Sequence, residues 1–135
     1  MRSSEHFAAS VPVTTLALAL VRKQCSRTRL ALFGIYGLAL GVFIDLDHFL
    51  LARVYAGDWH HLVDALTDPI EAFVEQEAIF DDIRDMTRQR LLSHVLVGGT
   101  LVGLTRRLSR PLGIVTALVL YWHLVCDLLR DNRIV

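Results

Sequence analysis

The stretch Gly41-Val-Phe-Ile-Asp45-Leu-Asp47-His48-Phe-Leu50 places two carboxylates and an imidazole in a run that is otherwise apolar from Leu30 to Ala52. A buried carboxylate without a partner is costly, so such groups pair, lose their charge or bind a cation. Two acids and a neutral nitrogen ligand suit a divalent metal. The sequence therefore predicts a polar site inside an apolar helix.

The composition predicts one helical membrane domain over residues 1–135. Hydrophobic residues make up 53% of the chain, and the mean hydropathy is +0.44. The net charge of zero hides an acidic connection, because residues 58–90 carry nine acids against three bases. No basic stripe with interleaved aromatic residues is present, so we expect no nucleic-acid partner.

Two cysteines, Cys25 and Cys126, cannot make a disulfide framework, and Cys126 falls in an apolar helix pattern that predicts a buried, inert thiol. The first apolar run continues to Arg22 without a small-residue cleavage site. We therefore expect the N-terminal segment to remain part of the protein rather than to act as a secretion signal.

Four apolar runs without strand-like alternation predict an all-α fold, a four-helix membrane-embedded bundle. The runs cover residues 7–21, 30–52, 91–104 and 112–129. Basic clusters follow the first and third runs, at residues 22–29 and 106–110. Compact basic loops favour the cytoplasmic side. We expect a multi-pass protein of the cell (inner) membrane, with the termini and the acidic connection on the other side.

Glycines recur at helical spacing in two of the runs, which predicts faces for close packing between helices. These glycines are Gly34, Gly37 and Gly41 in the second run and Gly98, Gly99 and Gly103 in the third.

The acidic connection predicts an additional amphipathic surface helix, with two helices as the alternative. Asp68 is expected to cap its start, with Pro69 at the first helical position and Glu71 reaching back. Its apolar stripe is Ile70, Phe73, Phe80, Ile83 and Met86. Two interpretations stay open, a solvated helix packed on the bundle and a lid or membrane-interface element over the site.

Six candidate metal ligands fall at the same, non-cytoplasmic end of the four expected helices. They are His6, Asp45, His48, His94, His123 and Asp127. Side chains at i, i+4 such as those of His123 and Asp127 share a helix face, whereas Asp47 points elsewhere unless the helix ends there. Metal binding and a purely structural network of His–Asp pairs both remain open.

Oxygen and nitrogen donors without a cysteine pair favour zinc, with manganese and iron as alternatives, and the number of donors allows two metals. A bound metal acidifies water for hydrolysis. If Asp47 is not a ligand, its carboxylate would be the catalytic group of the site. It would act either as a general base or by orienting a ligating imidazole.

These motifs resemble a family of prokaryotic membrane-bound, metal-dependent hydrolases sometimes described as LexA-binding and inner-membrane-associated. The similarity rests on an N-terminal His, an apolar helix ending in Asp45-Leu-Asp47-His48, Ser93-His94 opening a later helix, and His123-x3-Asp127. It implies remote similarity to zinc-dependent phospholipase C and single-strand nucleases, and hence hydrolysis of a phosphoester or lipid headgroup. No residue of this sequence points to LexA binding.

The chain departs from the family pattern in two places. Ile44 stands where the family has Pro, and Arg88-Gln-Arg90-Leu-Leu-Ser93-His94 replaces His-Arg-Gly-Leu-Thr-His. The second change removes one possible ligand, so the sequence does not decide whether a complete two-metal site forms. His60 and His61 could substitute, although a pair of loop histidines is more often solvated.

Two other functions compete with the hydrolase. In one, the chain is a non-catalytic membrane scaffold or interaction protein, whose acidic connection recruits a protein partner not identifiable from the sequence, while the His and Asp residues pair with each other. In the other, it transports an ion, although no inverted repeat or broken helix is readable.

Overall fold

The computed structural model describes residues 3–75, 79, 80, 83 and 87–134, and these residues contain helices and no strand. The all-α prediction is therefore confirmed for this part of the chain. The helices are α1 (Ser3–Val21), α2 (Arg27–Phe43), α3 (Asp47–Ala56), α4 (His60–Thr67), α5 (Pro69–Val74), α7 (Thr87–Leu108) and α8 (Arg110–Asp131), with 3₁₀ turns at Arg22–Gln24 and Ile44–Leu46.

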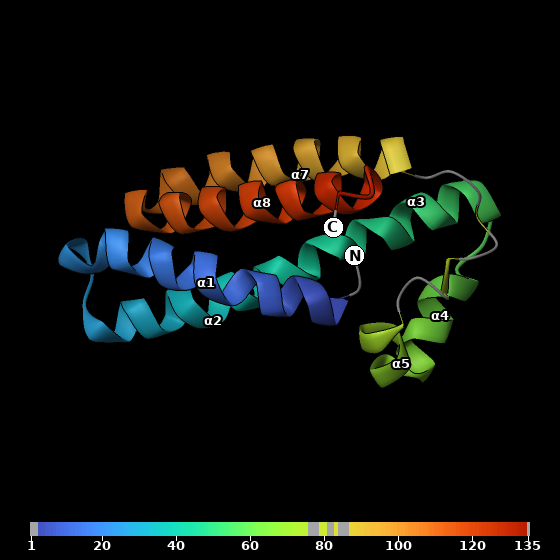
Figure 1. Ribbon diagram of the computed structural model, residues 1–135, viewed down its shortest axis with the longest axis horizontal. Helices are drawn as coiled ribbons and strands as arrows, with labels where there is room; N and C mark the ends of the chain where they lie inside the picture. Colours follow the sequence, from blue (N-terminus) through green and yellow to red (C-terminus); the bar gives the residue numbers. More distant parts are fainter. Residues whose placement is uncertain (1–2, 76–78, 81–82, 84–86, 135) are drawn as a thin grey trace.

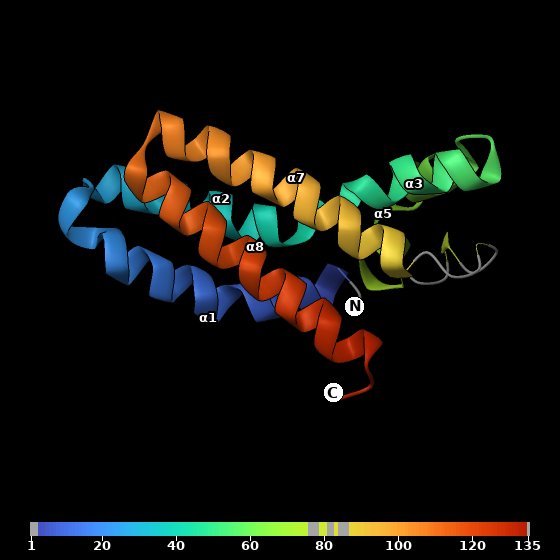
Figure 2. The ribbon, with the colours of Figure 1, turned by 90° about the horizontal axis from the view of Figure 1, so that it is seen from above.

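Four long segments lie side by side as two helical hairpins (Figure 1). α8 packs against α7, α1 and α2, and α1 also packs along α2. Both basic connections, between α1 and α2 and between α7 and α8, lie at one end of the molecule, and α3, α4 and α5 lie at the other (Figures 1 and 2). The arrangement agrees with the expected charge asymmetry between the two ends.

The apolar core extends from the basic connections to Ile44, the residue that precedes Asp45. Its buried members are Ala17, Val21, Leu40, Ile44, Val115, Val119 and Leu120. Cys126 is also buried, as predicted, and both cysteines are free thiols. Towards the other end the buried side chains become polar.

α1 illustrates an interior more polar than the exterior. Its buried face begins with Ser3, His6, Ser10 and Thr14, whereas Leu16 and Leu20 are more than half exposed. Large apolar side chains facing outward and small or polar ones facing a neighbouring helix are typical of helices packed in lipid. Three segments are long and apolar enough to cross a membrane, namely Ser3–Gln24, Arg27–Ala56 and Arg110–Asp131.

The fourth predicted span differs from these three. α7 is long enough, but it is not among the segments apolar enough to cross a membrane. Its first two turns contain Arg88 and Arg90, and its last turn contains Arg106 and Arg107. The arginines, together with Ser93, His94 and several glycines, lower its hydropathy.

Small residues allow α1 and α2 to approach closely. A Cβ atom added at Gly41 would lie 2.6 Å from the Cβ of Ser10, and one at Gly37 would lie 2.8 Å from Cγ2 of Thr14. The close-packing prediction is confirmed for this face. It is wrong for Gly99 and Gly103, because a Cβ at either would meet nothing within 4 Å among the described residues.

The predicted amphipathic helix is only partly correct. Asp68 caps α5 as expected, because its Oδ1 accepts a hydrogen bond from the backbone N–H of Glu71 at 3.0 Å. However, α5 ends at Val74, and Ile70 is exposed rather than packed on the bundle. Met86 lies outside the described residues. A further short helix, α4, precedes α5 and was not predicted.

Candidate metal centre

Five elements bring the six candidate ligands together at the polar end of the bundle, and His48 comes from α3. His6 comes from α1, Asp45 from the 3₁₀ turn, His94 from α7, and both His123 and Asp127 from one face of α8. Each of these side chains is almost completely buried. Residues that are far apart in the sequence therefore form one enclosed cluster, as their common depth predicted.

The break between α2 and α3 decides how the acids of the central motif point. α2 ends at Phe43 and α3 begins at Asp47, with the 3₁₀ turn between them. A 3₁₀ turn has three residues per turn, so it rotates the following side chains relative to a continuous α-helix. Asp45 and Asp47 are both buried as a result, which answers the question that the sequence left open about Asp47.

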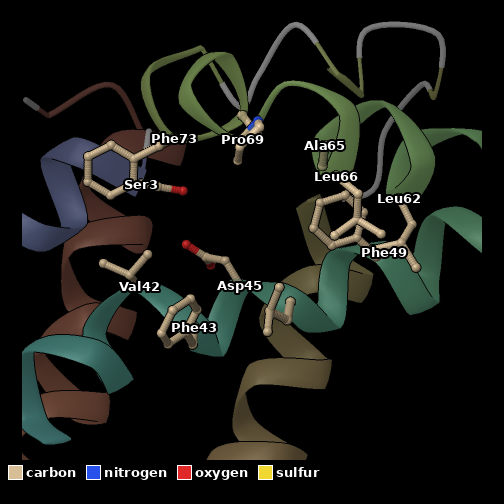
Figure 3. A pocket seen from close by; sticks show the side chains of 12 residues that line it. Ser3, Val42, Phe43, Asp45, Phe49, Leu62, Ala65, Leu66, Pro69 and Phe73 are labelled. Carbon is tan, nitrogen blue, oxygen red and sulfur yellow. The ribbon is translucent and has the colours of Figure 1, made fainter.

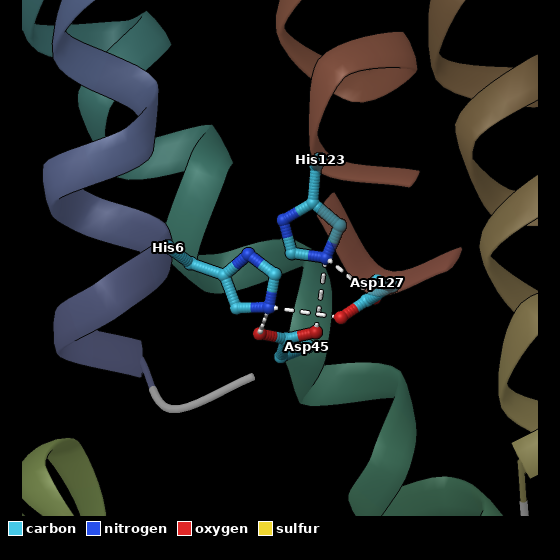
Figure 4. A group of neighbouring side chains, drawn as sticks. All are labelled: His6, Asp45, His123 and Asp127. Carbon is cyan, nitrogen blue, oxygen red and sulfur yellow. Dashed lines mark ion pairs between the residues drawn. The ribbon is translucent and has the colours of Figure 1, made fainter. Parts of the chain in front are cut away.

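The first group of possible ligands is His6, Asp45, His123 and Asp127 (Figure 4). His6 Nε2 lies 3.1 Å from Oδ1 of Asp127 and 3.8 Å from Oδ2 of Asp45. His123 Nε2 lies 3.2 Å from Oδ1 of Asp45 and 3.4 Å from Oδ2 of Asp127. Ligand atoms of a tetrahedral zinc site lie about 3.3 Å apart, given bonds of about 2.0–2.1 Å. The spacing therefore suits a metal.

A second group shares Asp45 with the first and adds His48 and His94. His94 Nε2 lies 3.0 Å from Oδ1 of Asp45, and His48 Nε2 lies 3.5 Å from the same oxygen. His94 Nε2 is also 3.6 Å from Oδ2 of Asp127, so the two groups adjoin. All six sequence-predicted ligands thus belong to one of two groups that share a carboxylate.

The ring orientations of two histidines leave Nε2 directed at the acids. His123 Nδ1 donates a hydrogen bond to the carbonyl oxygen of Gly41 at 3.0 Å, and His94 Nδ1 donates to Oδ2 of Asp47 at 2.8 Å. The same Asp47 oxygen accepts from the hydroxyl of Ser93 at 2.6 Å. Metal-binding histidines are usually held in this way, by a carbonyl or carboxylate on the other ring nitrogen.

Several buried polar atoms of the cluster make no hydrogen bond within the part of the chain that the structure describes. They include Nε2 of His6, His48 and His123, Oδ2 of Asp45 and Oδ1 of Asp47. Buried polar atoms are nearly always satisfied, and exceptions call for a water or an ion. An imidazole nitrogen whose partner nitrogen already carries the proton is a lone-pair donor, which is attracted to a cation and repelled by a carboxylate. The donor set therefore fits a bound divalent cation.

The two histidines of the acidic connection have different environments. His60 is exposed, and its backbone N–H and ring both bond to Asp58. These bonds lower the pKa of the Asp58 carboxyl below its usual value. The expectation of a solvated pair is wrong for His61, which is 1% exposed and stacks on Phe80 with ring centroids 5.5 Å apart. Phe80 also meets the ring of His48 edge-on, so His61 lies behind the cluster.

One residue near the cluster had no role assigned from the sequence. Arg90 Nη2 donates to both carboxylate oxygens of Asp131, at 2.6 and 2.7 Å, and so joins α7 to the end of α8. Arg90 precedes His94 by four residues and shares its helix face. The sequence shows the spacing of Arg90 and His94, but it does not show that Arg90 pairs with Asp131.

Comparisons with known protein families, with curated protein sequences and with solved structures find no match for this chain.

Proposed function

We propose that the protein is a multi-pass membrane protein with a divalent metal, zinc fitting best, at the non-cytoplasmic end of a four-helix bundle. Three apolar segments and the outward-facing leucines of α1 support the membrane assignment. The basic connections share one end of the molecule (Figure 1). That end is assigned to the cytoplasm because compact basic loops are retained there.

The metal assignment depends on one observation above all. Nε2 atoms of three buried histidines, His6, His94 and His123, each lie 3.0–3.8 Å from oxygens of Asp45 and Asp127. Two carboxylates, Asp45 and Asp127, buried together with neutral imidazoles would be strongly unfavourable without a positive charge. A divalent ion held by Asp45, Asp127 and these imidazoles supplies that charge.

The function that this centre supports best is hydrolysis of a phosphoester at the membrane. A divalent ion supplies an acidified water and neutralises charge that develops on phosphoester oxygens. In this chain Asp45 and Asp127 would hold the ion, His6 and His123 would complete its donors, and Asp47 orients His94. Asp47 Oδ2 accepts hydrogen bonds from both Ser93 and His94. We therefore assign Asp47 mainly to positioning His94, and a role as general base is secondary.

Elemental analysis of the detergent-purified protein tests the centre. We expect about one or two zinc, manganese or iron ions per chain in the wild type and none in the Asp45→Ala/His123→Ala double variant. His60→Ala is the matched control, because it removes an exposed imidazole outside the cluster and should leave the metal content unchanged. Circular dichroism verifies that all three proteins remain helical. A wild-type protein that stays metal-free after incubation with zinc and manganese would refute the proposal.

A specific observation favours a second candidate, a non-catalytic scaffold with structural His–Asp pairs. Both ring nitrogens of His94 face carboxylates, at 2.8 Å from Asp47 and 3.0 Å from Asp45, and an imidazolium there would satisfy both acids. In that case the wild type binds no metal. Truncating Asp45 would then destabilise the bundle by about 3–5 kcal/mol, because a buried charge loses its partner.

A further inference from the structure

A cavity of about 180 Å³ lies between the α2–α3 segment and the α4–α5 pair (Figure 3). Its walls are largely aliphatic and aromatic side chains, among them Phe49, Leu62 and Phe73. Two polar residues, Ser3 and Asp45, also line it, and Figure 3 shows the hydroxyl and the carboxylate pointing towards one another. The cavity is thus apolar except at the place where Ser3 and Asp45 face one another.

Asp45 connects this cavity to the candidate metal centre. It belongs to both groups of possible ligands, and its Oδ1 lies 3.0 Å from His94 Nε2 and 3.2 Å from His123 Nε2. Oδ2 makes no hydrogen bond with any described residue. A molecule in the cavity would therefore have its polar end at a ligand of the centre and its remainder among apolar side chains.

The cavity also opens towards a surface that would face lipid. Phe43, Leu46 and Leu66 line it and are 61%, 53% and 72% exposed. Phe43 and Leu46 belong to the segment Arg27–Ala56, which is apolar enough to cross a membrane. Leu50, four residues beyond Leu46, continues the same exposed apolar stripe. The cavity is therefore continuous with the outer face of a membrane-spanning segment.

We propose that this cavity receives the hydrocarbon chain of a lipid phosphoester, which enters from the bilayer with its phosphate directed to the metal centre. The inference rests on the proposed function and names its substrate class. A water-soluble phosphoester would find few hydrogen-bonding groups in these walls, whereas a chain would bury apolar surface. The cavity volume equals the volume that about six water molecules occupy in the liquid. The cavity therefore holds only the part of the hydrocarbon chain next to the phosphate.

Binding of an alkyl phosphate series to the zinc-loaded protein tests the inference. Methyl, propyl, butyl and hexyl phosphate are titrated by isothermal calorimetry, because these short chains partition little into detergent micelles. Each methylene group that enters the cavity should strengthen binding about fourfold. Affinity should then level off once the chain fills the space.

Two substitutions on the same helix separate the cavity from general apolar attraction. Ala72→Trp on α5 fills the cavity from its lining and should abolish the dependence on chain length. Ile70→Trp adds the same bulk at a residue that is 77% exposed and should preserve it. Ala65→Trp fills the space from α4 and serves if the Ala72 variant does not fold. None of the three residues is a candidate ligand, so zinc content should stay at the wild-type level.

The outcomes separate this inference from the function on which it rests. A protein that binds no zinc refutes the metal centre itself. A protein that binds zinc but shows equal affinity for methyl and hexyl phosphate keeps the centre and refutes the hydrocarbon site, and equal binding of glycerol phosphate would then indicate a soluble substrate. Chain-length dependence that persists in both the Ala72→Trp and Ala65→Trp variants would also refute the inference.

Discussion

Gly41→Ala should destabilise the bundle, whereas Gly99→Ala should stabilise it, although both replace a helical glycine by the same residue. A Cβ at Gly41 would lie 2.6 Å from the Cβ of Ser10, about 1 Å closer than carbon atoms normally approach. Overpacking of this kind costs about 1–3 kcal/mol. The better helix propensity of Ala recovers about 1 kcal/mol. At Gly99 only the favourable term applies, because nothing described lies within 4 Å of the added atom.

The difference between the two variants isolates the contact between α1 and α2. The propensity term is common to both, so their free energies of unfolding should differ by about 1–3 kcal/mol. Unfolding by dodecyl sulfate in mixed micelles, followed by circular dichroism, measures this difference. Ser10→Gly in the Gly41→Ala background should restore part of the loss, as a double-mutant cycle would show. Equal stability of the two variants would refute the close approach of α1 and α2 at Gly41.

Two further predictions concern the centre and the acidic connection. Asp47→Ala should weaken zinc binding about 10–100-fold in a chelator competition, because His94 loses the acceptor that orients it. Asp47→Asn should weaken binding less, because its amide oxygen still accepts the hydrogen bond. Equal zinc affinity of the Asp47→Ala variant and the wild type would contradict this role. Asp68→Ala should destabilise α5 by about 1 kcal/mol through loss of its N-cap, seen as faster amide exchange in α5, whereas Asp64→Ala on α4 should leave α5 unaffected.

The sequence was most informative where a property depends on neighbouring residues alone. The N-cap at Asp68 and the helical state of the apolar runs were predicted because hydrogen-bonding groups and periodicity are local. The glycine faces show the limit. Gly37 and Gly103 stand in similar patterns, but only Gly37 meets a neighbouring helix. Spacing indicates that residues share a face, and it does not indicate which face has a partner.

The break at Ile44–Leu46 could not be predicted from this chain, which has neither Pro nor Gly there. Pro commonly ends a helix by removing a hydrogen-bond donor. In this chain the helix breaks without a proline, at a turn where Ile44 and Asp45 are buried against other segments. The acidic connection was predicted only in part for a related reason, because an apolar stripe indicates a helical segment but not where that helix ends, and α5 ends at Val74.

For the candidate site, the sequence supplied the residues and their common depth but not their orientation. His94 and His123 have similar apolar surroundings in the sequence, yet one is held by a carboxylate and the other by a backbone carbonyl. His61 was expected in solvent, and its burial depends on Phe80, nineteen residues later in the chain. Hydrogen-bond partners of this kind follow from the packing of distant segments, which spacing along one helix does not contain.

Gly41 shows how that packing and the candidate centre depend on each other. Its missing side chain lets α1 approach α2 at Ser10, one turn from His6, while its carbonyl oxygen accepts the hydrogen bond that orients His123 on α8. The same residue therefore sets the distance between α1, which carries His6, and the helix that leads to Asp45, and it also sets the direction of a third ligand, His123. His6 and His123 stack with ring centroids 3.8 Å apart, so a shift of α1 away from α2 would change both imidazoles together. The acids alone could be accommodated by pairing, but imidazoles fixed in this way are positioned to share a cation.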